Sequence, residues 1–173
     1  MEIRELSDIA FYVEEKISSK NIRLENYVTT DSLRQNKEGR DIARNLPPGV
    51  ASLTRFIEGD VLMGNIRPYL KKVWQATESG GCSADVLAFR AKENHDKDFL
   101  LACLLHDSFY DYVMSGKKGS KMPRGDKSHI MGYKIPVFSL CEEKQIGNIV
   151  ALIMKKIALN EQLNHNLAPR LAA

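Results

Sequence analysis

Apolar and polar residues alternate in short runs over most of the chain, and Gly, Pro and Asn separate the runs. Period-two alternation bounded by turn residues is typical of β-strands. The runs VASLTRFI, DVLMGNI and DVLAFRA predict strands at residues 50–57, 60–66 and 85–91. Between the strand candidates and the end of the chain, apolar residues at helical spacing predict one helix over residues 97–116, which Gly116 would stop.

The pattern changes near residue 140, where a second helix is predicted. Its apolar and amide residues follow one another at alternating spacings of four and three, which is a heptad seam that Pro169 would end. The seam residues are Ile146, Val150, Ile153, Ile157, Asn160, Asn164 and Leu167. Leu152, Leu159 and Leu163 widen the apolar stripe, so we expect the helix to touch more than one surface. Packing on its own domain is the alternative, but we interpret the seam as a coiled coil between two chains.

These elements predict an α+β fold: a mixed globular domain over residues 1–139, a coiled-coil helix over 140–168 and a tail over 169–173. The length of 173 residues suits one domain with a sizeable core, and 43% hydrophobic with 27% charged residues is ordinary for a globular protein. No apolar run approaches the length of a membrane span. Three widely spaced cysteines favour reduced thiols, so we expect a cytoplasmic protein.

Candidate catalytic motifs fail on spacing. The run GKKGSK lacks the spacing of a phosphate-binding P-loop, and NLPPGV lacks the aromatic residue of the Asn-Pro-Pro motif of amino-methyltransferases. The four histidines share no metal-ligand spacing with one another or with the cysteines, and a lone Cys82 is more often a core residue than a nucleophile. We therefore expect no catalytic residues, no metal site and no cofactor.

Positive charge is concentrated in two segments instead. Residues 117–127 hold five basic residues and one acid in a chain whose formal net charge is only +3, and residues 65–77 hold three basic residues and no acid, beside Tyr69 and Trp74. Basic side chains among aromatic residues and glycines suit contacts with nucleic-acid phosphates and bases, although solvated basic loops are common. The candidate DNA-binding residues are Arg67, Tyr69, Lys71, Lys72, Lys117, Lys118, Ser120, Lys121, Arg124, Lys127 and His129.

Motifs in these segments resemble the specificity subunit of type I restriction-modification systems. They are GDVLMGNIRPYLKKVW, GGCSADVLAFRA and KGSKMPRGDKSHIMGYKIPV, in this order and followed by a long helix, with ENYVTTDSL and RFIEGDVL upstream. The resemblance covers about residues 1–168, as one target recognition domain and one helical spacer. It implies a non-catalytic subunit that selects the DNA sequence for separate methyltransferase and restriction subunits, with residues 67–72 and 117–129 facing double-stranded DNA.

A full-length member of this family has two recognition domains and two spacers, whereas this chain has one of each. Both a natural half-length subunit and a segment of a longer chain fit this length. We expect a homodimer through the terminal helix, with antiparallel helices by family precedent, and hence a split, inverted-repeat target. A scaffold that regulates methyltransferase subunits without reading bases is the alternative, and it would need the helix but neither basic segment.

Overall fold

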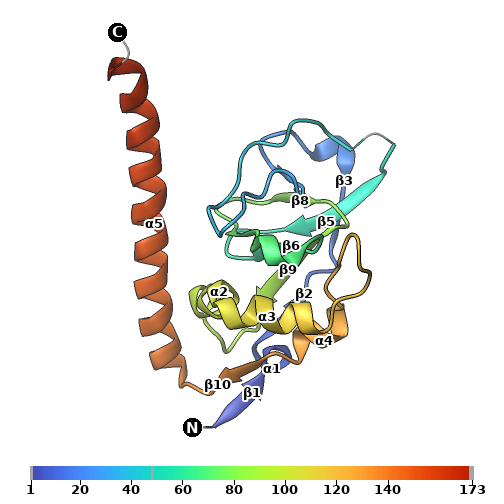
Figure 1. The fold of residues 1–173 in the computed structure, drawn as a ribbon, viewed down its shortest axis with the longest axis vertical. Helices are drawn as coiled ribbons and strands as arrows, with labels where there is room; N and C mark the ends of the chain where they lie inside the picture. The colour runs from blue at the N-terminus through green and yellow to red at the C-terminus, as the bar shows by residue number, and fades with distance from the viewer. Residues whose placement is uncertain (1, 48, 172–173) are drawn as a thin grey trace.

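The computed structural model describes residues 2–47 and 49–171, with side chains up to residue 164. Two four-stranded sheets and one two-stranded sheet form the domain (Figure 1). The first sheet has the order β2 (Ala10–Tyr12), β9 (Val86–Ala91), β6 (Val61–Gly64), β7 (Val73–Gln75), and the second has the order β3 (Lys16–Ser18), β5 (Ser52–Phe56), β8 (Gly80–Cys82), β4 (Tyr27–Val28). Strands β1 (Ile3–Glu5) and β10 (Lys134–Pro136) pair antiparallel. The α+β class is confirmed, and β5, β6 and β9 lie within the three predicted strands.

The core lies on both sides of the first sheet, because side chains of a strand alternate between its faces. Val61 and Met63 of β6 point into the cluster under the helices, while Leu62 joins a second cluster with Phe56 and Val28 of the other sheet. Helices α2 (Lys97–Leu105) and α3 (Asp107–Ser115) contribute to the first cluster. The shorter helices are α1 (Leu6–Ile9), η1 (Ser19–Asn21), η2 (Pro68–Leu70) and α4 (Lys127–Met131).

The single helix predicted over residues 97–116 is wrong, because α2 and α3 are separate. His106 between them has extended backbone, with φ −69° and ψ 137°, and its side chain accepts a hydrogen bond from the Ser108 N–H. A side chain that caps the next helix makes the extended conformation favourable at this point. The apolar periodicity runs through both helices and carries no sign of the break.

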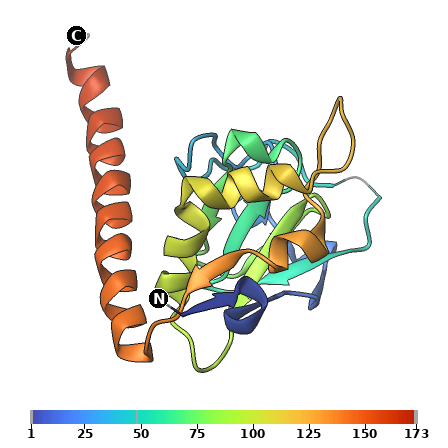
Figure 2. The ribbon, with the colours of Figure 1, turned by 60° about the horizontal axis from the view of Figure 1, so that its bottom comes forward.

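Helix α5 (Leu140–Leu171) begins where the sequence predicts and continues past Pro169, where we expected it to end. In Figures 1 and 2 it stands on one side of the domain, with its first half beside α2. Ile146, Val150 and Met154 pack against the core cluster under the helices. Gly147 permits a close approach, since a Cβ there would lie 2.7 Å from the Phe99 nitrogen. No helix of the described residues is long and apolar enough to cross a bilayer.

Buried Glu143 fixes the start of α5 to the domain. Its Oε1 lies 2.6 Å from the Arg4 guanidinium of β1 and 2.9 Å from His95 Nδ1, and its Oε2 accepts a hydrogen bond from the Asp96 N–H at 3.0 Å. Its side chain is fully buried, and a buried carboxylate is tolerated where several donors surround it. Glu143 therefore joins the N-terminal strand, the loop before α2 and the long helix.

Candidate nucleic-acid interface

The fold brings the two basic segments of the sequence together. The Arg67 N–H donates to the Pro123 carbonyl at 2.8 Å, and Ile66 and Arg124 form an isolated antiparallel bridge. Buried Asn65 reinforces this junction, because its amide both accepts from the Gly125 N–H (3.1 Å) and donates to the Gly125 carbonyl (3.3 Å). A Cβ at Gly125 would lie 2.9 Å from that amide oxygen, so glycine allows the contact. Residues about 60 positions apart thus form one surface.

The second segment is a projecting hairpin over residues 118–124, visible on the side of the domain away from α5 (Figures 1 and 2). Lys118 and Arg124 exchange two backbone hydrogen bonds, of 2.8 and 2.9 Å, which close the hairpin. Ser120, Lys121 and Met122 lie exposed at its tip. Residues Lys127–Met131 form α4, so the hairpin is followed by a helix, and Asp126 caps this helix by accepting from the His129 N–H.

Some of the basic side chains are engaged by carboxylates and others are free. Lys118 pairs with Asp126, and Arg124 pairs with Asp85 at 3.0 Å. The hydrogen bond from Lys118 holds the pKa of Asp126 below its usual range. Lys117, Lys121 and Arg67 are exposed and have no acidic partner among the residues that the structure describes. These three side chains are available to an external anion.

The first segment is organised around η2, whose flanking residues adopt unusual backbone conformations. Arg67 and Lys71 have φ of 52° and 51°, a left-handed region that side chains other than glycine seldom adopt. Tyr69 at the centre of η2 is 49% exposed. The Trp74 ring, in contrast, is half-buried and lies 4.4 Å from the Arg40 guanidinium, so of the two aromatic residues Tyr69 is the one that faces outward.

The lysines of the first segment are held by partners within the domain. Lys71 Nζ lies 2.8 Å from Asp107 Oδ1, which also accepts from Lys37 Nζ at 2.6 Å. These two hydrogen bonds lower the pKa of Asp107 to about 2. Lys72 donates to the Thr30 carbonyl. Lys71 and Lys72 are therefore less available than Arg67, a distinction that the charge pattern of the sequence does not contain.

Two further predicted residues, Lys127 and His129, make structural contacts. The His129 ring stacks on Tyr112 with centroids 4.1 Å apart, and its Nε2 lies 2.9 Å from the Tyr112 carbonyl. The Lys127 ammonium lies 5.7 Å from the centre of the Tyr12 ring, and its carbonyl accepts from the Tyr12 hydroxyl. These contacts attach α4 to the domain and so position the hairpin.

A third segment, which the charge pattern does not indicate, lies beside the first. The N–H groups of Asn36 and Lys37 donate to the carbonyls of Leu70 (3.0 Å) and Lys71 (2.9 Å). The run RQNKEG carries two basic residues and one acid, so charge counting passes over it. The sequence does contain one indication of a turn here: Asn36 precedes Gly39, and Asn favours left-handed turn positions.

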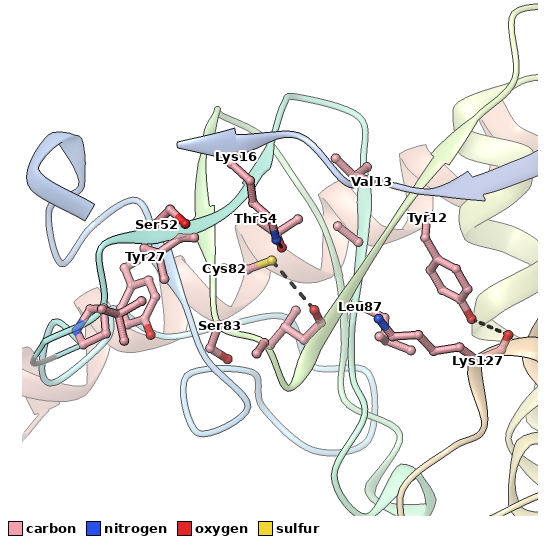
Figure 3. A pocket seen from close by; sticks show the side chains of 16 residues that line it. Tyr12, Val13, Lys16, Tyr27, Ser52, Thr54, Cys82, Ser83, Leu87 and Lys127 are labelled. Carbon is pink, nitrogen blue, oxygen red and sulfur yellow. Dashed lines mark hydrogen bonds between the residues drawn. The ribbon is translucent and has the colours of Figure 1, made fainter. Parts of the chain in front are cut away.

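A pocket of about 260 Å³ opens between the two larger sheets (Figure 3). Tyr12, Tyr27, Lys16 and Lys127 lie around it, and Cys82 lies within it. Burial raises the pKa of the Cys82 thiol to about 12, so this thiol stays protonated at neutral pH and is no activated nucleophile. Among the described residues, no group of three or more His, Cys, Asp or Glu is placed to hold a metal ion.

The second candidate surface is an apolar stripe on α5. Side chains of Leu152, Leu159 and Leu163 are 67%, 54% and 50% exposed, and Ile149, Ile153 and Ile157 flank them. Ile146 and Val150, the first two residues of the predicted seam, pack on the domain instead, so the exposed stripe is rotated toward the leucines. Asn160 and Asn164 are exposed, and the Leu167 side chain lies outside the described part.

The family model for the type I restriction modification DNA specificity domain matches residues 1–168, nearly the whole chain. The chain belongs to this family. Over 125 residues it is 30% identical to the type I restriction enzyme EcoDI specificity subunit of Escherichia coli, covering 71% of this chain and 28% of that one. The family resemblance of the sequence motifs is thereby confirmed.

Solved specificity subunits have the same fold. The HsdS subunit from Thermoanaerobacter tengcongensis aligns with a TM-score of 0.67 at 19% identity, covering 96% of this chain and 45% of that one. The S subunit from M. genitalium aligns with a TM-score of 0.55 at 13% identity, covering 97% and 41%. This chain thus spans less than half the length of these two relatives.

Proposed function

We propose that this chain provides DNA recognition in a type I restriction-modification complex. It selects the target sequence and performs no chemistry itself. Methyltransferase subunits, joined by restriction subunits for cleavage, carry out the reaction at the site that it selects. The proposed place of action is the cytoplasm, which suits the three free cysteines.

The observation that carries this proposal is the junction of the two basic segments in a member of a DNA specificity family. The Arg67–Pro123 hydrogen bond and the Asn65–Gly125 pair hold a projecting hairpin beside η2. Free Arg67, Lys117 and Lys121 give this surface positive charge, which attracts phosphates, while Ser120 and Tyr69 add groups that contact bases or sugars. A scaffold that never reads DNA needs no such surface.

The salt dependence of DNA binding tests the proposal. Each phosphate contact contributes about 0.9 to the slope of log K against log salt concentration. Lys117→Ala with Lys121→Ala should therefore weaken binding to duplex DNA and lower the slope by about 2. The matched control, Lys144→Ala with Lys155→Ala on exposed positions of α5, should leave both unchanged. Equal slopes for the wild type and the hairpin variant would show that the hairpin is merely solvated.

The exposed stripe of α5 supports a second part of the proposal, a homodimer. Helix α5 has one apolar face against its own domain and a neighbouring apolar face in solvent, formed by Ile149, Leu152, Ile153, Ile157, Leu159 and Leu163. Burying leucine and isoleucine side chains contributes about 1.5–3 kcal/mol each. Pairing two such helices antiparallel supplies the second recognition domain and spacer that the family's longer members carry in one chain, and makes the target an inverted repeat.

A further inference from the structure

A tight turn at residues 35–38 lies beside the proposed DNA-binding surface. Asn36 and Lys37 have φ of 56° and 66°, and the Glu38 N–H donates to the Gln35 carbonyl at 3.2 Å. Two central residues with positive φ mark a type I′ turn, in which glycine is normally preferred at the second position. The chain places Lys37 there despite the steric cost, and its ammonium reaches Asp107.

The turn is fixed from three directions. Its two central N–H groups donate to the carbonyls of Leu70 and Lys71, and the Arg34 N–H and Gly39 carbonyl close its base at 2.9 Å. Lys37 is held by Asp107 of α3, while Arg34 at the root of the turn lies 2.7 Å from Glu161 of α5. Residues held in costly backbone conformations by several partners are typical of functional sites, where the position of a side chain matters.

The exposed side chains of this turn are the two amides Gln35 and Asn36 and the carboxylate Glu38. Gln35 and Asn36 are exposed, and neither side chain makes a hydrogen bond to any residue that the structure describes. An Asn or Gln amide donates to N7 and accepts from N6–H₂ of adenine in the major groove, as a bidentate pair. Lysine and arginine cannot make this pair, because they only donate.

The turn and the hairpin are attached to the same short segment of the chain, η2 and its flanking residues. The turn is bonded to η2 at Leu70 and Lys71, and the hairpin is bonded at Arg67. The turn therefore adjoins exposed Tyr69 at the centre of η2 and exposed Arg67 before it.

We propose that the turn at residues 35–38 reads an adenine-containing base pair through the amides of Gln35 and Asn36. The inference rests on the proposed function and adds the specificity-determining residues, whereas the basic hairpin supplies affinity. Removing an amide should change which sequence is bound while leaving the phosphate contacts in place.

Selection of bound duplexes from a random DNA library by the full chain tests this inference. Asn36→Gly is the sharpest variant, because glycine suits φ 56° and so keeps the turn while it removes the amide. We expect this variant and Gln35→Ala to lose about tenfold of the preference for adenine at one or two positions of each half-site. Affinity for the unselected library and the melting temperature should match the wild type.

Asn94→Gly is the matched control, since Asn94 is an exposed amide in the loop before α2, next to the start of α5. It should select the wild-type motif. Identical motifs from all four proteins would overturn the inference and leave the proposed function intact, as would a uniform loss of affinity at every position. A wild-type chain that enriches no motif at any salt concentration would overturn the proposed function itself.

Discussion

At the scale of single residues, charge in the sequence and charge available at the surface are different quantities. The charge pattern assigned equal weight to Arg67, Lys71 and Lys72, but Asp107 and the Thr30 carbonyl occupy the two lysines. These partners lie 36 and 42 positions away in the chain, so no local pattern could identify them. The same holds for His129, whose basic character matters less than its stacking on Tyr112.

Asp107 offers a test at this scale. Its pKa of about 2 in the folded protein is below the ordinary 3.8, so its ion pairs stabilise the fold above pH 4 and are lost as the pH falls toward 2. Asp107→Asn should free Lys37 and Lys71 for phosphates and steepen the salt slope of DNA binding by up to about 2. Asp111→Asn, at an exposed acid one turn further along α3, should leave the slope unchanged. An unaltered slope for Asp107→Asn would mean that these lysines do not face DNA.

At the scale of elements, periodicity predicted what each segment forms but not how it ends or where it packs. Strands β5, β6 and β9 were predictable because their alternation reflects burial between layers. The break at His106 was not, because a single capping side chain decides it. The α5 seam was partly predictable: the helix exists, but contact with α2 takes Ile146 and Val150 away from the outer stripe.

Glu143 determines how α5 is attached, and its replacement tests that role. Glu143→Gln leaves Arg4 without its buried carboxylate, and breaking a buried ion pair costs about 3–5 kcal/mol of unfolding free energy. Urea unfolding followed by circular dichroism should show this loss. Lys144→Gln, at the exposed neighbouring position, should change the stability by less than about 0.5 kcal/mol. A Glu143→Gln variant as stable as the wild type would contradict the anchoring role.

At the scale of the whole molecule, the proposed recognition surface and the proposed dimerisation stripe lie on different elements that contact each other. The Arg34–Glu161 ion pair links the root of the turn at residues 35–38 to α5, and Glu143 links α5 to the domain. The orientation of the helix therefore sets the orientation of the reading surface. In a two-fold dimer, this coupling determines the separation of two identical half-sites.

The fold class and the family were accessible from the sequence, since ordered motifs and periodicity survive without coordinates. The position of the turn at residues 35–38 was not, because it depends on backbone hydrogen bonds from Asn36 and Lys37 to a segment more than 30 positions later. The assignment of free and occupied lysines depends in the same way on long-range contacts. The one signal for this turn within its own sequence is the propensity of Asn for left-handed turns, which does not indicate a function.

The most direct test of symmetric DNA recognition is to select duplexes from a random library with the purified wild-type chain. The selected motif is then examined for inverted-repeat symmetry. We predict two inverted half-sites at fixed spacing. Leu152→Asp with Leu159→Asp should be monomeric by light scattering and select a single half-site, because charge on the stripe prevents pairing. The control, Lys155→Asp with Gln162→Asp, uses the same spacing on other exposed positions and should keep the repeat. A single half-site, or no motif, from the wild-type chain would contradict the proposal.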